Sequence, residues 1–156
     1  MTRYVTVVGK KKLEDELNEL KAKRNDIAAQ IKEAREFGDL KENAEYAAAR
    51  EAQNNLEIRV KEVEALLQNL TVFSYKTAKT DQVNLGTAVL VENVKTKKQE
   101  TYVVTGFMEF DIEKNYISNE SPKGNALLGK KVGEIAIIKT PVSQIELKIL
   151  KISHAE

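Results

Sequence analysis

Two long segments with a heptad pattern constrain the fold of this chain more than any other feature. The first steps alternately by four and three residues and has one polar intruder, with positions at Leu13, Leu17, Leu20, Arg24, Ile27, Ile31 and Ala34. The second repeats this spacing at Tyr46, Ala49, Gln53, Leu56, Val60, Val63, Leu67 and Leu70. Gly38 is the only strong helix breaker between them. Two helices joined by so short a turn must run antiparallel, so the sequence predicts a slim hairpin roughly 40 Å long.

The turn of this hairpin is rich in negative charge, with carboxylates at Glu36, Asp39, Glu42 and Glu45. A narrow arm that ends in carboxylates can carry charge or metal ligands into a cavity of a partner. The same residues also fit a capping box, in which Asp39 caps the second helix, Glu42 follows three residues later and Gly38 ends the first helix. Both interpretations stay open, because a capping carboxylate can also turn toward a cation.

The second half of the chain changes to the period of strands. We expect strands at residues 87–94, 100–105, 116–118, 135–139 and 145–152, and a short helix at 126–130 capped by Asn125. The sequence therefore predicts an α+β fold, in which a coiled-coil hairpin precedes a small sheet domain.

Composition narrows the class of protein. The 156 residues contain 25 basic and 24 acidic side chains, which is not the charge balance of a protein that binds free nucleic acid through its phosphates. The chain has no cysteine, so disulfides and thiolate metal sites are excluded. We see neither a signal peptide nor a membrane span, and expect a cytoplasmic protein without a membrane partner.

Several motifs together resemble one known family. The segment from Gly38 to Tyr46, preceded by Glu33-Ala34-Arg35, is similar to the tip of the bacterial Gre transcript cleavage factors, closest to their GreA group. The resemblance continues in order through residues 115–118, 121–122, 126–133 and 139–141, and so covers nearly the whole chain. Two local departures are Asn25, where the family usually has Pro, and Val142-Ser143, where it usually has Gly-Gly.

The resemblance implies a fold and a division into domains. Residues 1–76 would form an antiparallel coiled-coil arm with an acidic tip. Residues 77–156 would form an FKBP-like, antiparallel-sheet domain with a short helix, which anchors the protein to its partner.

The resemblance also implies a function. The arm would enter the secondary channel of bacterial RNA polymerase and stimulate Mg²⁺-dependent cleavage of the backtracked nascent RNA 3′ end, which rescues arrested complexes. Asp39 and Glu42 would hold a Mg²⁺ ion shared with the polymerase, or Glu42 would orient the attacking water. The protein alone would bind no cofactor, would not be an enzyme and would be a monomer.

Other residues receive supporting roles from the same resemblance. The tip would be shaped by Gly38, Leu40, Asn43 and Tyr46. Basic side chains on the arm are candidates for contacts with RNA or polymerase, although a solvated helix face with partners four residues away is the favoured interpretation: Lys21, Lys23, Arg24, Arg35 and Arg50.

Two alternative functions belong to other classes. One is a regulator that enters the same channel and inhibits polymerase without cleavage; such proteins depart from the Asp-Leu-x-Glu-Asn tip, which this chain retains. The other is a coiled-coil RNA-binding arm, which would need basic helix faces and a catalytic domain. This chain shows neither.

Overall fold

The computed structural model describes residues 2–38 and 43–155. The chain forms two compact units, one of residues Lys10–Asn69 and the other of Met1–Gly9 together with Leu70–Glu156. The expected architecture, a helical hairpin followed by a sheet domain with a short helix, is confirmed. Whether residues 1–76 and 77–156 behave as separate domains stays a prediction, because a compact unit need not fold independently.

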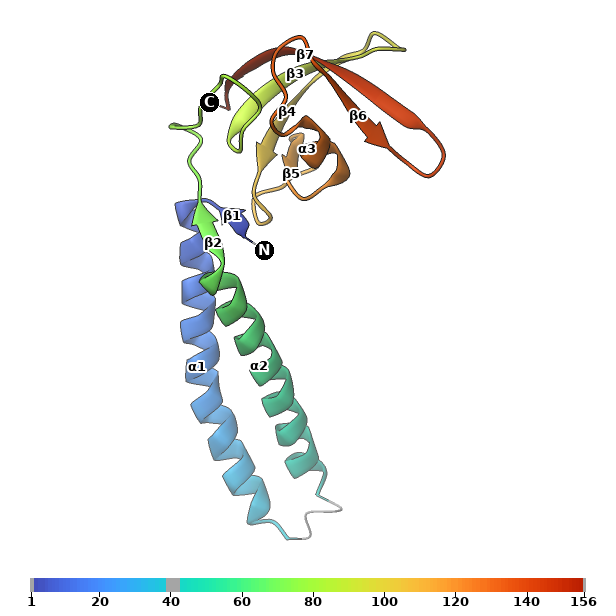
Figure 1. The fold of residues 1–156 in the computed structure, drawn as a ribbon. Coiled ribbons are helices and arrows are strands. Elements are labelled where there is room, and N and C mark those ends of the chain that lie inside the picture. The colour runs from blue at the N-terminus through green and yellow to red at the C-terminus, as the bar shows by residue number, and fades with distance from the viewer. Residues whose placement is uncertain (1, 39–42, 156) are drawn as a thin grey trace. The chain divides into compact units, whose positions relative to one another are not determined.

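The hairpin consists of α1 (Val7–Arg35) and α2 (Ala44–Gln68), which run side by side in opposite directions (Figure 1). The heptad positions form its seam as expected. The residues Leu13, Ile31, Ala34, Ala49, Leu56, Val60 and Val63 are buried, and the other seam positions of the two helices are half-buried. The seam is bulky toward the base of the hairpin and thin toward the turn, where Ala34 and Ala49 take the place of branched side chains.

Two bidentate ion pairs cross the hairpin beside the seam. Arg24 of α1 donates hydrogen bonds to Glu57 of α2, from Nε to Oε1 at 2.8 Å and from Nη2 to Oε2 at 3.1 Å. In the opposite direction, Arg59 of α2 pairs with Glu16 of α1, with Nη2 to Oε1 at 2.8 Å. The polar intruder in the first heptad pattern is thus matched by a carboxylate on the facing helix.

The other unit contains a five-stranded sheet in the order β5-β4-β3-β7-β6 (Figure 1). Its strands are β3 (Thr87–Asn93), β4 (Gln99–Thr105), β5 (Tyr116–Ser118), β6 (Ile135–Lys139) and β7 (Gln144–His154). Neighbouring strands are antiparallel except for the pair β4 and β5, which is parallel. The core combines one face of this sheet with Leu127 of α3 (Pro122–Leu127), through Val83, Val89, Val91, Tyr102, Val104, Ala136, Ile138, Leu147 and Ile149.

The short helix α3 lies earlier in the chain than expected. It begins at Pro122, and its N-cap is Ser121, whose Oγ accepts a hydrogen bond from the Gly124 amide at 3.1 Å. Proline suits this first helical position because the missing N–H has no partner inside the helix. The prediction of a helix at 126–130 capped by Asn125 is therefore wrong, since the helix already ends at Leu127.

The first residues of the chain pair with the segment that follows α2. Strand β1 (Arg3–Val5) lies parallel to β2 (Leu70–Val72). The α1 N-terminus is closed by Thr6, whose Oγ1 accepts from the Gly9 amide at 3.1 Å and donates to Glu109 Oε1 at 2.8 Å. Residues 3–9 thus join the sheet-containing unit through backbone pairing and a half-buried cap.

Candidate functional site

The candidate site is the turn between α1 and α2, and the structure describes both of its ends. The residues expected to hold a metal ion, Asp39 and Glu42, lie outside the described residues, as does Leu40. The described residues around them are 33–38 and 43–46. Their geometry decides where the chain leaves the first helix and enters the second.

Helix α1 ends in a tight turn that leads to Gly38. The amides of Glu36 and Phe37 donate to the carbonyls of Glu33 and Ala34, at 3.1 and 3.2 Å. Gly38 follows with φ at +115°, a region that side chains disfavour, but α1 itself already ends at Arg35, so the expected role of Gly38 as the residue that ends the first helix stays a prediction. Phe37 is 69% exposed beside it and leaves a large apolar ring at the tip.

Asn43 is the N-cap of α2, and the prediction that Asp39 caps this helix is wrong. The side-chain Oδ1 of Asn43 accepts a hydrogen bond from the Tyr46 amide at 3.1 Å, which satisfies one of the free donors in the first turn of α2. Capping by Asn43 relieves Asp39 of that role, so the N-cap of α2 gives no reason for a carboxylate at position 39.

The same asparagine also reaches the opposite helix. Its Nδ2 donates to the Ala34 carbonyl in the last turn of α1, at 2.6 Å. One residue after Ala34 and three residues after Asn43, the Arg35 guanidinium carbon lies 5.9 Å from the centroid of the Tyr46 ring, a cation–π distance. These four residues, Ala34, Arg35, Asn43 and Tyr46, are called the tip clasp below.

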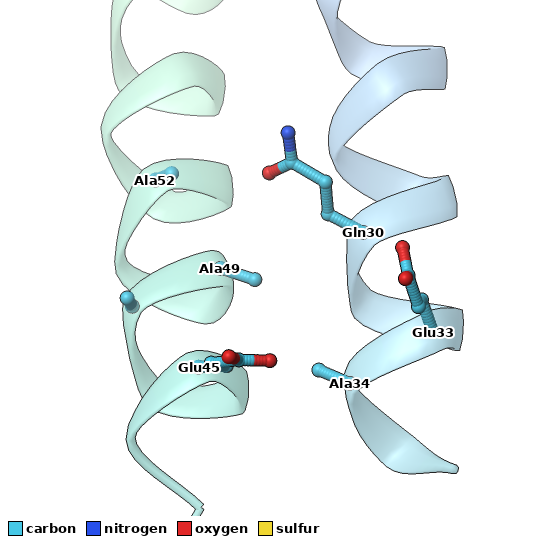
Figure 2. A pocket seen from close by; sticks show the side chains of 7 residues that line it. Gln30, Glu33, Ala34, Glu45, Ala49 and Ala52 are labelled. Carbon is cyan, nitrogen blue, oxygen red and sulfur yellow. The ribbon is translucent and has the colours of Figure 1, made fainter. Parts of the chain in front are cut away.

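A cleft of about 350 Å³ opens between the two helices just behind the tip clasp (Figure 2). Its walls are mostly alanine, and Glu33 of α1 and Glu45 of α2 stand on opposite sides of it, as Figure 2 shows. Its lining residues are Gln30, Glu33, Ala34, Glu45, Ala48, Ala49 and Ala52. Within residues 2–38 and 43–155, no group of three His, Cys, Asp or Glu side chains is placed to hold a metal ion.

The basic candidates on the arm differ in their surroundings. Lys21 and Lys23 are exposed. Arg24 is held by Glu57, whose hydrogen bonds and charge raise the pKa of Arg24. Arg35 faces the Tyr46 ring, and Arg50 donates to Gln53 Oε1 at 3.3 Å. The structure therefore places Arg24 and Arg35 in contacts within the hairpin, which the sequence pattern did not reveal.

The sheet-containing unit has a polar cluster in a hollow of its own, of about 300 Å³. The Tyr102 hydroxyl donates to Glu100 and accepts from Lys123 Nζ at 3.0 Å. The hydrogen bonds from Tyr102 and then Lys98 lower the pKa of Glu100, so the cluster keeps a carboxylate between two ammonium groups.

No helix in the described ranges has the length and apolar character that crossing a membrane requires.

Comparisons with known proteins agree across the length of the chain. The family model "Transcription elongation factor, N-terminal" matches residues 3–72, and the model "Transcription elongation factor, GreA/GreB, C-term" matches residues 78–154. The transcription elongation factor GreA of Thermoanaerobacter pseudethanolicus is 45% identical over 149 residues, which are 95% of each chain. That of Pseudomonas syringae pv. tomato is 43% identical over 157 residues, 99% of each chain.

Solved structures give weaker likenesses. The GreA factor homolog 1 (Gfh1) protein of Thermus thermophilus is 22% identical and covers 97% of this chain and 99% of its own, with a TM-score of 0.45. The GreA/GreB elongation factor of Nitrosomonas europaea is 14% identical, covers 98% of each chain and has a TM-score of 0.43. On the two family models and the curated relatives, the chain belongs to the GreA/GreB family of transcription elongation factors.

Proposed function

We propose that this elongation factor inserts its hairpin into the secondary channel of bacterial RNA polymerase and stimulates cleavage of the backtracked RNA 3′ end. The observation that carries the proposal is the tip clasp, which joins the last turn of α1 to the first turn of α2. In the sequence, Asp39 and Glu42 belong to the short segment between these two helix ends. Membership in the GreA/GreB family supports the same function. The slim, alanine-rich end of the hairpin suits entry into a narrow channel.

The chemistry follows from the properties of Mg²⁺. Hydrolysis of a phosphodiester by two metal ions requires ligands for both, and polymerase carboxylates would hold one ion firmly and the second weakly. Asp39 and Glu42 would add oxygen ligands to the second ion, or Glu42 would orient and deprotonate the attacking water. The remaining tip residues, Gly38, Leu40, Asn43 and Tyr46, would shape the turn that presents them.

The isolated protein would have no nuclease activity. Mg²⁺ gives up its hydration water reluctantly, and two carboxylates on an exposed turn are too few to hold it without the polymerase. The active site would thus be shared between two proteins. The factor would bind no cofactor of its own, and would act in the cytoplasm, as a monomer, where polymerase and nascent RNA are its partners.

The alternative function is that of an inhibitor that occupies the channel without promoting cleavage. The two functions make opposite predictions for the same assay. Stalled, backtracked elongation complexes with 3′-labelled RNA are incubated with Mg²⁺ and the factor, and RNA length is followed in time. We expect short 3′ fragments to be released and elongation to resume; an inhibitor would leave the RNA intact and elongation blocked.

A control without polymerase tests the shared-site claim separately. Naked RNA of the same sequence, with Mg²⁺ and the factor, should stay intact. If highly purified factor cuts naked RNA in a Mg²⁺-dependent way, the protein is an enzyme in its own right.

A further inference from the structure

We propose that Asn43 is a positioning residue for the carboxylates of the turn, because its side chain ties the last turn of α1 to the first turn of α2. This inference rests on the proposed cleavage function. It adds a physical account of how the ends of segment 39–42 are held, in which one amide acts on both helices at once.

The hydrogen bonds of Asn43 use the two ends of its side-chain amide for two different helices. The Nδ2 group donates to the Ala34 carbonyl at 2.6 Å, and Oδ1 accepts from the Tyr46 amide at 3.1 Å. A planar amide carries a donor and an acceptor at a fixed separation, whereas an ionised carboxylate can only accept and a serine hydroxyl is too short to span the same gap. Asparagine therefore fits this position for a reason beyond helix capping.

A second contact closes the clasp from the next residue along α1. Arg35 lies over the face of the Tyr46 ring, and Tyr46 is also the residue whose amide Asn43 caps. Ala34 is only 3% exposed, so its carbonyl is held at a packed point of the seam and does not sit on a loose helix end. The two contacts join two neighbouring residues of α1, Ala34 and Arg35, to the N-cap and the first turn of α2.

The apolar seam is thin near the turn, where Ile31 is the last branched seam residue of α1. Behind the clasp lies a cleft of about 350 Å³, and four of its seven lining residues are alanines, which bury little surface; the others are Gln30, Glu33 and Glu45 (Figure 2). The branched seam residues Leu56, Val60 and Val63 lie further toward the base. Without the clasp, the ends of the two helices would be free to separate while the rest of the hairpin stayed packed.

Separation of the two helix ends matters because Mg²⁺ tolerates little variation in the positions of its ligands. Mg²⁺ requires near-octahedral ligands at about 2.0–2.1 Å, and a displacement of about 1 Å in a reacting group can lower a rate on the order of a hundredfold. Only four residues connect Gly38 to Asn43, so the spacing of these two ends limits where Asp39 and Glu42 can reach. The clasp would pre-organise the turn before it meets the ion.

The substitution Asn43→Ser keeps the N-cap hydrogen bond and removes the hydrogen bond to the Ala34 carbonyl. Serine is as good an N-cap as asparagine, so α2 keeps its start, and it is neutral, so no charge is added near the metal. Its side chain cannot reach the Ala34 carbonyl while it caps. We expect at least a tenfold lower cleavage rate at saturating factor and a several-fold higher Mg²⁺ concentration for half-maximal rate. The affinity for polymerase, measured by competition with labelled wild-type factor, should stay within twofold.

The Mg²⁺ dependence is the readout that a merely structural role would not move, because it is measured at saturating factor. Asn55→Ser is the matched control, since Asn55 is an exposed residue of the same helix. It should behave as the wild type in all three measurements. If Asn43→Ser proves unfolded by far-UV circular dichroism, Asn43→Thr takes its place, because threonine is also a neutral N-cap residue and its hydroxyl lies as close to the backbone as that of serine.

The outcomes distinguish this inference from the proposed function. If the wild type does not stimulate cleavage, the proposed function is wrong. If the wild type cleaves and a folded Asn43 variant cleaves with the same rate and Mg²⁺ dependence, the positioning role is overturned. If the variant loses polymerase affinity in proportion to cleavage, Asn43 contacts the polymerase, and the positioning role is again wrong.

Discussion

Arg24 and Glu57 lie opposite each other on the two helices of the arm and form a bidentate ion pair, with both nitrogen–oxygen distances at or below 3.1 Å. The two side chains are 43% and 39% exposed. Arg24 is the one charged residue in the heptad pattern of the first segment. The ion pair with Glu57 gives Arg24 a structural role in the hairpin, whereas the neighbouring Lys21 and Lys23 are exposed.

The first prediction tests the structural role of Arg24. Arg24→Gln and Glu57→Gln should lower the melting temperature by similar amounts. The double variant should lose less stability than the two single losses added together, because each change removes the same ion pair. Thermal unfolding of the three variants measures the effect. Lys21→Gln with Lys23→Gln should leave stability unchanged. If Arg24→Gln weakens polymerase binding while Glu57→Gln does not, Arg24 contacts the polymerase or its RNA after all.

The second prediction concerns acid stability and the pair between Glu16 and Arg59. The hydrogen bond from Arg59 lowers the pKa of Glu16 below 4.5, its ordinary value. The contribution of this carboxylate to stability is therefore present above about pH 4.5 and is lost as the pH falls through the lowered pKa. For a partly exposed pair of this kind we expect less than about 1 kcal/mol.

Glu16→Gln checks the sign of this dependence. The free energy of unfolding of the variant should lie below that of the wild type at pH 7, and the difference should shrink as the pH falls below about 4.5 and vanish once Glu16 is protonated in the folded protein. Urea unfolding at several pH values measures it. A difference that grows toward acid pH would contradict the account.

The third prediction concerns how the first strand reaches the sheet-containing unit. A Cβ atom on Gly106 would collide with the carbonyl oxygen of Tyr4, which also accepts a hydrogen bond from the Phe107 amide at 3.3 Å. Gly106→Ala should therefore displace β1 and cost about 3 kcal/mol. Hydrogen exchange should accelerate at the Phe73 amide, which donates to Val5 at 2.9 Å. Unchanged protection of that amide would show that β1 tolerates the methyl group.

The fourth prediction is a tyrosine titration. Burial, and next the charge of Glu109, raise the pKa of Tyr75 to about 12 from an ordinary value of 10. Stability should therefore decline between about pH 10 and 12, because the unfolded chain loses this proton first. In an absorbance titration at high pH, Tyr75→Phe should remove the latest of the tyrosine steps. If it removes a step near pH 10, the Tyr75 hydroxyl is exposed in solution.

Much of the fold could be predicted from the sequence because its signals are local. The heptad spacing from Leu13 to Ala34 needs no knowledge of the partner helix to predict a buried seam, and the strand periods of the second half are equally local. The pairing of β1 with β2 was missed, since three-residue strands almost seventy positions apart carry no pattern of their own. The start of α3 was missed because Asn125 was given the capping role of Ser121.

The cap of α2 was not predicted correctly from the sequence. The pattern Asp39-Leu40-Lys41-Glu42 favours a capping box, whereas Asn43 has Tyr46, and no acidic residue, three positions later. Asn43 is nevertheless the cap of α2, and its second bond, to Ala34, is a contact between helices that local spacing does not encode. The roles of Asp39 and Glu42 stay predictions.

The central claim is that Asp39 serves the metal ion and not the helix, and Asp39→Asn tests it most directly. The N-cap of α2 is Asn43, so this substitution should change the free energy of unfolding by less than about 0.5 kcal/mol and leave polymerase binding unchanged. It would remove the charge that a hard cation prefers. The measurement is the rate of 3′ RNA cleavage in backtracked complexes at saturating factor. We predict a fall by orders of magnitude; cleavage at the wild-type rate would contradict the account.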